Sequence, residues 1–102
     1  MGVEKSRPHY RLDQMQVEIA RLGAAAFTKT AIDGGRAMGL TMAEMLAVIA
    51  GLTRRDFYKS MTTHADHHVW QDVYHAATPA GCVAYIKLTQ VNDRPVVQFK
   101  ER

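Results

Sequence analysis

The sequence predicts an α+β protein in which helices come first and antiparallel strands follow. Three observations support this class. Apolar residues recur at helical spacing in the first half, and period-two alternation replaces them after residue 57. Near the C-terminus, Asn92-Asp93 separates two alternating runs as a tight hairpin turn does. We therefore expect N-terminal helices packed on a small antiparallel sheet formed by the C-terminal half.

Size and composition narrow the class of protein. A chain of 102 residues, 47% of them hydrophobic, is expected to form one globular domain over residues 1–102. A net charge of +3 favours anionic partners, with nucleic acid first. The single cysteine, Cys82, argues against a disulfide-stabilised secreted domain. The sequence has no membrane-length apolar run and its first residues do not resemble a signal peptide, so we expect a soluble cytoplasmic protein.

The helical half divides into three segments after a polar start that we expect to be extended. Apolar spacing predicts a first helix over residues 12–22. A second short helix is expected over about residues 31–38, although Gly34-Gly35 disfavours it. Thr41-Met-Ala-Glu44 has the capping-box pattern, which predicts a third helix that ends at Gly51.

The second half is predicted to be strands. Residues 53–56 are expected to form one more helical turn, and residues 57–61 a short strand. The run over residues 69–74 alternates, with Trp70 expected in the core on one face and Gln71 on the other. Thr78-Pro-Ala-Gly81 is a turn pattern, and the hairpin follows it.

A two-residue loop at Asn92-Asp93 fixes the hairpin register. Tyr85 then faces Lys100 and Lys87 faces Gln98, so these four polar side chains share one side of the sheet. Pro95 lacks an amide hydrogen, which favours an edge position for the last strand. Two interpretations of the polar side remain open here: a solvated sheet surface, or a basic, aromatic platform for a phosphodiester.

Several motifs resemble the MqsR toxin family. They are RPHYRL at residues 7–12, DFYKSMTT at 56–63, WQDVY at 70–74 and VQFKE at 97–101. The resemblance covers nearly the whole chain. It implies a RelE-like fold and the toxin half of a bacterial type II toxin–antitoxin pair. It also implies an endoribonuclease, an mRNA interferase that cuts without metal or other cofactor at GC-containing sites such as GCU. The implied partner is an MqsA-like antitoxin, which binds a toxin that is monomeric when free.

The same resemblance implies four catalytic residues by matching motif. The lysine of DFYKSM is Lys59, the glutamine of WQDVY is Gln71, and the lysine of the terminal FKE is Lys100. The tyrosine of the strand after the glycine turn is Tyr85.

One departure from the family pattern precedes this tyrosine. The family usually has G-x-V-Y-x-K, whereas this chain has GCVAYIK over residues 81–87, one residue longer. The extra residue lies either before the strand or in a bulge. Hairpin pairing still places Tyr85 opposite Lys100.

Metal-free RNA cleavage requires the 2′-hydroxyl to attack its own phosphate, giving a 2′,3′-cyclic phosphate and a 5′-hydroxyl. Lys59 and Lys100 are candidates for stabilising charge, or for proton transfer if the pKa is lowered. Tyr85 is a candidate for base stacking or proton donation, and Gln71 for bonding a phosphate or base edge. Further RNA contacts are expected from four side chains: Arg55, His67, Lys87 and Gln98.

The cluster HADHH at residues 64–68 raises the alternative of a metal site. No cysteine or second carboxylate stands at ligand spacing, and adjacent His67 and His68 point apart in an extended segment, so we expect loop residues and no metal. His9 and His75 are interpreted as surface residues. Three functions thus compete: an endoribonuclease toxin, a non-cleaving RNA- or antitoxin-binding regulator, and a metal-dependent hydrolase built on HADHH.

Overall fold

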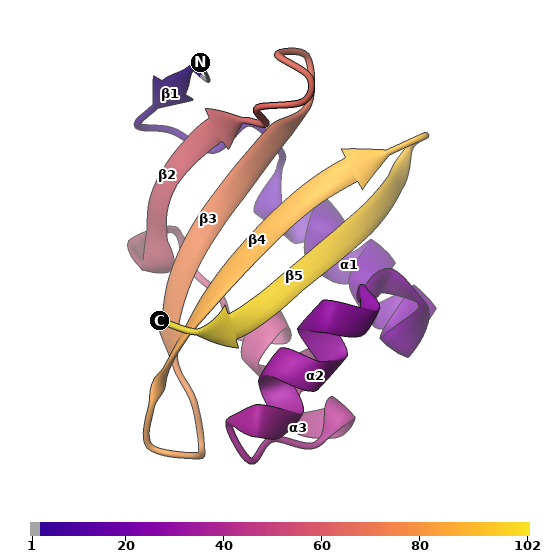
Figure 1. Cartoon of the computed structure of the whole chain (residues 1–102), viewed down its shortest axis with the longest axis vertical. Coiled ribbons are helices and arrows are strands. Elements are labelled where there is room, and N and C mark those ends of the chain that lie inside the picture. The colour runs from indigo at the N-terminus through magenta and orange to yellow at the C-terminus, as the bar shows by residue number, and fades with distance from the viewer. Residues whose placement is uncertain (1–2) are drawn as a thin grey trace.

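The computed structural model describes residues 3–102 and has two layers (Figure 1). Three α-helices cover one face of a five-stranded antiparallel sheet, whose strand order is β1-β2-β3-β4-β5. The helices are α1 (Leu12–Leu22), α2 (Lys29–Ala37) and α3 (Met42–Ala50). The strands are β1 (Glu4–Lys5), β2 (Phe57–Thr62), β3 (Trp70–Ala77), β4 (Val83–Val91) and β5 (Arg94–Glu101). The predicted α+β class is confirmed.

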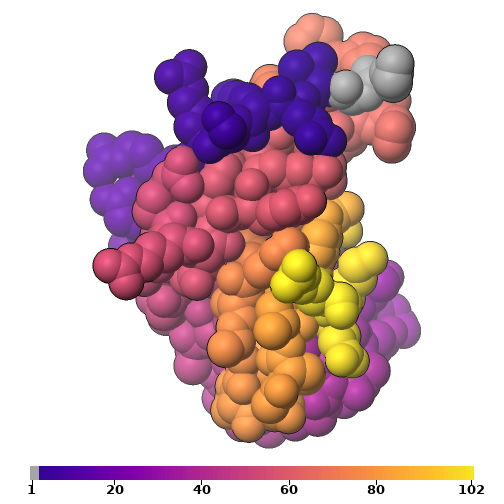
Figure 2. Space-filling view, turned by 90° about the vertical axis from the view of Figure 1, so that its left-hand side faces the viewer, coloured from indigo at the N-terminus to yellow at the C-terminus, as the bar shows by residue number. Residues whose placement is uncertain are grey.

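The sheet contains one strand that the sequence analysis missed. β1 comes from the N-terminal segment and pairs with β2, with Glu4 opposite Met61 and Lys5 opposite Ser60. In Figure 2 this segment lies across the outer edge of β2. The predicted sheet of the C-terminal half thus gains one short edge strand from the N-terminal segment, which sequence patterns do not reveal because two residues are too few to show alternation.

The helices follow their predicted boundaries closely. α1 and α3 match, and the capping box of Thr41 and Glu44 is present in both directions. α2 begins earlier than expected because Thr28 caps it, accepting a hydrogen bond from the Ala31 amide at 3.0 Å. Gly34 lets α2 approach β5, since a Cβ there would overlap the Phe99 carbonyl oxygen. A helix-weakening glycine thus serves the packing of helix on sheet.

The predicted C-terminal hairpin is confirmed residue by residue. Asn92 and Asp93 have φ of 53° and 61°, the left-handed values that a two-residue hairpin turn requires. β5 is an edge strand, as Pro95 predicted. β4 pairs with β3 without a register shift from Val83 to Thr89. The extra residue of this chain is therefore accommodated in the turn before β4 and not in a bulge.

The core lies between the helices and the sheet, and the sheet contributes one side chain from every second position. Its fully buried members on the sheet are Tyr74, Ala84, Ile86, Leu88, Val97 and Phe99. Trp70 faces the same way but was wrongly expected in this core. It is half-buried, with the His9 ring stacked at 5.2 Å and Lys5 Nζ 4.1 Å from its ring centre.

A buried carboxylate fastens the N-terminal segment to the sheet. Asp72, 1% exposed, accepts hydrogen bonds from the backbone amides of His9 and Tyr10 at 3.0 and 2.9 Å. The Ser60 hydroxyl donates to it at 2.6 Å. Three donors offset the cost of burying this charge, so the aspartate of WQDVY positions chain segments instead of facing a substrate. Among residues 3–102, no helix has both the length and the hydropathy to cross a membrane.

Candidate active site

The sheet face opposite the helices carries most of the predicted site residues. Strand pairing aligns them in parallel lines across the sheet. One line contains Lys59, Val73, Lys87 and Gln98, because each of these residues is the register partner of the next. We call the whole of this side the open face.

The neighbouring line runs through His75, Tyr85 and Lys100, which are likewise successive register partners. Five of the predicted residues therefore lie on two adjacent lines. Gln71 lies on the open face as well, paired with Thr89, in a third line roughly 7 Å further along β3 from Val73. It is beside the cluster, not in its centre.

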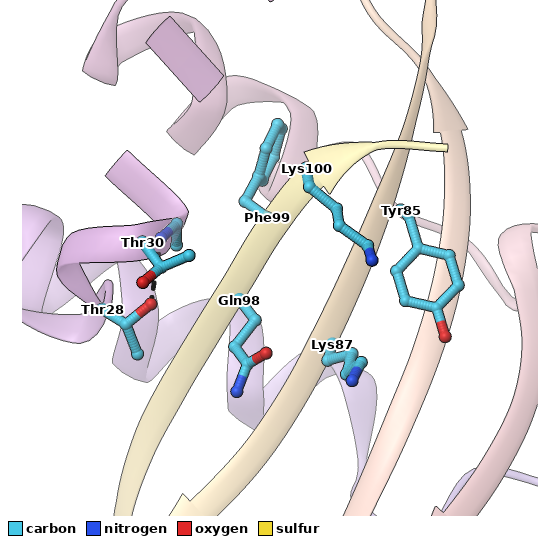
Figure 3. A pocket seen from close by; sticks show the side chains of 8 residues that line it. Thr28, Thr30, Tyr85, Lys87, Gln98, Phe99 and Lys100 are labelled. Carbon is cyan, nitrogen blue, oxygen red and sulfur yellow. Dashed lines mark hydrogen bonds between the residues drawn. The ribbon is translucent and has the colours of Figure 1, made fainter. Parts of the chain in front are cut away.

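Two cations meet at the ring of Tyr85. Lys100 Nζ lies 5.3 Å and Lys87 Nζ 5.9 Å from the ring centre, within range of cation–π attraction. These side chains, with Gln98, line one side of a pocket of about 180 Å³ (Figure 3). Thr28 and Thr30, at the start of α2, line the other side. The pocket concentrates positive charge beside a phenol hydroxyl.

The lysines on the open face differ in how their surroundings affect protonation. Burial lowers the pKa of Lys87, and the charges of Lys100 and Lys59 lower it further. Lys59 Nζ instead donates a hydrogen bond to Glu4 at 3.0 Å, which raises the pKa of Lys59. Lys59 is therefore held as a cation. Lys87 has a pKa moved toward neutrality, as suits a group that exchanges protons.

His75 was expected to be a surface residue, and this was wrong. Its ring is half-buried in the middle of the open face, 4.5 Å from the Tyr58 ring in a stack and 5.4 Å from the tilted Tyr85 ring. Its Nε2 is buried and has no hydrogen-bond partner among the residues that the structure describes. Burial lowers the pKa of His75, and the charge of Arg102 adds to this shift.

Sequence reasoning missed Tyr58 and His75 for different reasons. His75 pairs with Tyr85. The sequence predicts a strand over residues 69–74, and extending that strand by one residue would have placed His75 on the same face as Gln71. Tyr58 precedes Lys59, and simple alternation would place them on opposite faces. A register shift between Phe57 and Lys59 breaks that alternation. No residue type in the DFYKSMTT motif predicts this shift.

Two of the predicted RNA-contacting residues lie apart from this cluster. His67 is exposed in the loop between β2 and β3, and Arg55 is exposed in the short 3-10 helix Arg54–Asp56. The polar groups of the HADHH segment bond one another. The Asp66 carboxylate accepts hydrogen bonds from the His68 backbone amide at 2.8 Å and from the His68 ring Nδ1 at 3.1 Å. Over residues 3–102, no three His, Cys, Asp or Glu side chains are grouped to hold a metal ion.

Comparison with known proteins agrees with the motifs. Residues 7–101 match a family described as the motility quorum-sensing regulator, toxin of MqsA. A relative from Escherichia coli (strain K12), the mRNA interferase toxin MqsR, is 42% identical over 100 residues. The alignment covers 98% of this chain and 100% of the relative.

Proposed function

This chain belongs to the MqsR toxin family, and we propose that it is an endoribonuclease that cleaves mRNA without a metal ion. The observation that supports this most strongly is the gathering of three lysines on one sheet face: Lys87 and Lys100 flank the Tyr85 ring, and Lys59 lies in the same line of register partners as Lys87. Three ammonium groups are suited to neutralise the dianionic phosphorane that forms when a 2′-hydroxyl attacks the adjacent phosphate.

The role that we assign to each residue follows from its surroundings. Lys59 and Lys100 stabilise charge, and the raised pKa of Lys59 keeps it cationic throughout the reaction. Lys87, with its lowered pKa, is the lysine best suited to exchange a proton with the attacking or leaving oxygen. Tyr85 contributes its ring or hydroxyl beside them. Gln71, further along β3, bonds a phosphate or base edge of the flanking nucleotide.

The biological setting follows from the names of the family and the relative. We propose that the chain is the toxin of a type II toxin–antitoxin pair, monomeric when free and bound by an MqsA-like antitoxin in the cytoplasm. The substrate is mRNA, cut at GC-containing sites such as GCU. The description of the family as the toxin of MqsA supports the antitoxin partner. The name of the relative, an mRNA interferase, supports mRNA as the substrate.

A chemical test separates this mechanism from its alternatives. An end-labelled RNA containing one GCU is incubated with the full chain in EDTA, beside the same RNA carrying 2′-deoxy nucleotides at that site. The proposal predicts cleavage of the first RNA only, with a 2′,3′-cyclic phosphate on the upstream product. Cleavage of the deoxy substrate would exclude attack by the 2′-hydroxyl. Tight binding without cleavage would favour the non-cleaving regulator.

A further inference from the structure

Three aromatic rings form a continuous row across the open face. Tyr58 comes from β2, His75 from β3 and Tyr85 from β4, and each ring contacts the next, with centres 4.5 and 5.4 Å apart. We call these three residues the aromatic row. His75 and Tyr85 lie in the line that ends at Lys100, so the row leads into the basic cluster.

A lysine lies at each end of the row, and the one at the Tyr58 end, Lys59, is paired with Glu4. Lys59 Nζ lies 5.5 Å from the centre of the Tyr58 ring, and Lys100 Nζ lies 5.3 Å from that of Tyr85. Protonation of His75 would place an N–H at its buried, unpartnered Nε2, which is one reason the neutral ring is favoured. The face is thus apolar and aromatic in its middle and cationic at its sides.

Tyr58 is the exposed end of the aromatic row. It is 55% exposed, and within residues 3–102 the aromatic ring that it contacts is that of His75. A large aromatic side chain left open on a sheet, between ammonium groups, is the arrangement by which proteins hold single-stranded RNA. Ammonium groups attract the phosphates there, and rings accept bases by stacking.

We propose that the aromatic row is a nucleobase-binding subsite, in which Tyr58, supported by His75, stacks a base of single-stranded RNA beside the phosphate held by the lysines. This inference rests on the proposed function, since it names how the same face binds the substrate. It assigns roles to Tyr58 and His75 that the family motifs do not.

The stacking contact is tested by binding, so that cleavage does not interfere. A labelled single-stranded RNA containing GCU, with 2′-fluoro sugars that prevent cleavage, is titrated with the full chain at several salt concentrations. The variants are Tyr58→Leu, which keeps apolar bulk without a ring, and Tyr58→Phe, which keeps the ring. Lys100→Ala serves for comparison, and circular dichroism verifies that each variant is folded.

Salt dependence distinguishes a ring from a charge. Tyr58→Leu is expected to weaken binding about tenfold at every salt concentration, with an unchanged slope of log affinity against log salt. Tyr58→Phe should bind as the wild type does. Lys100→Ala should lower the slope by about 0.7, the amount one phosphate contact contributes in single strands. Wild-type affinity in Tyr58→Leu would overturn the inference and leave the proposed function intact.

An abasic scan identifies the base. Removing the base at one position of the RNA is expected to weaken wild-type binding by the same factor as Tyr58→Leu, and to have no further effect on that variant. Additive losses at every position would show that Tyr58 contacts no base and would overturn the inference. A wild-type chain that binds no RNA at all would instead contradict the proposed function itself.

Discussion

Lys87 is a residue of the proposed site whose surroundings also affect the stability of the fold. It is half-buried at the centre of the open face, where burial and two other lysines lower its pKa. At neutral pH its charge therefore opposes folding. A residue that costs stability at the centre of a site is typical of a functional group.

Replacing this lysine should separate stability from activity. Lys87→Met keeps the aliphatic stem and removes the charge, so we expect the free energy of unfolding to rise by about 0.5–1 kcal/mol while RNA cleavage falls. Urea denaturation measures the first effect and RNA cleavage the second. Lys29→Met, on an exposed lysine paired with Asp33, should change stability by less than about 0.5 kcal/mol. A destabilised Lys87→Met would contradict the electrostatic account.

His75 predicts a pH dependence of stability. Its pKa is lowered in the folded chain, so the unfolded chain binds the proton more readily. The stability that the neutral ring contributes is therefore fully present above the unfolded value of about 6.5. It is lost as the pH falls through the lowered pKa. We expect unfolding midpoints of the wild type to fall between pH 7 and pH 5, and His75→Phe to lose less over that range.

The matched replacement for this comparison is His64→Phe, in the exposed loop between β2 and β3. It should follow the wild-type pH profile. A His75→Phe profile parallel to that of the wild type would show that this ring does not titrate differently in the folded state.

The sequence predicts site residues where register is fixed locally. The hairpin turn at Asn92-Asp93 places Tyr85 opposite Lys100 and Lys87 opposite Gln98, and the structure confirms both pairs. Tyr58 and His75, which meet across two strands that no tight turn connects, were missed. The stack of Tyr58 on His75 needs the β2–β3 register and its shift, which two short patterns cannot define.

At the scale of elements, the same limit applies to how helices meet the sheet. Helix boundaries are set by local capping, and α1 and α3 were predicted correctly. Gly34-Gly35 was interpreted as a weakness of α2 because intrinsic propensity disfavours glycine. The reason for these two glycines is visible only in the tertiary structure. A Cβ at Gly34 would overlap the Phe99 carbonyl, and a Cβ at Gly35 would overlap the side chain of Met45.

This packing reverses the usual effect of replacing a helical glycine. Gly34→Ala should destabilise the chain by about 1–3 kcal/mol, because the added methyl group forces α2 away from β5. Gly51→Ala is the control. Gly51 has a φ of −89° and only ordinary contacts for a Cβ, so alanine there should be neutral or stabilise by about 0.5 kcal/mol. Thermal or urea unfolding compares them, and a stable Gly34→Ala would refute the close approach.

At the scale of the whole molecule, the fold separates two tasks between the faces of one sheet. The helix-covered face supplies the hydrophobic core, and the open face gathers lysines and aromatic rings. A modest net charge of +3 becomes a local concentration of positive charge because Lys59, Lys87 and Lys100 are near one another. Composition alone indicates only a weak preference for nucleic acid, and strand register gathers the charges into the site that we propose for RNA.

The central claim is that this open face cuts RNA without a metal ion. The most direct test measures cleavage of a GCU-containing RNA in EDTA by the wild type, by Lys59→Ala and by a control variant, Arg21→Ala. Arg21 pairs with Glu18 at the far end of α1. We predict cleavage by the wild type and by Arg21→Ala, and a rate about 100-fold lower for a folded Lys59→Ala. Loss of wild-type activity in EDTA, or full activity of Lys59→Ala, would contradict the account.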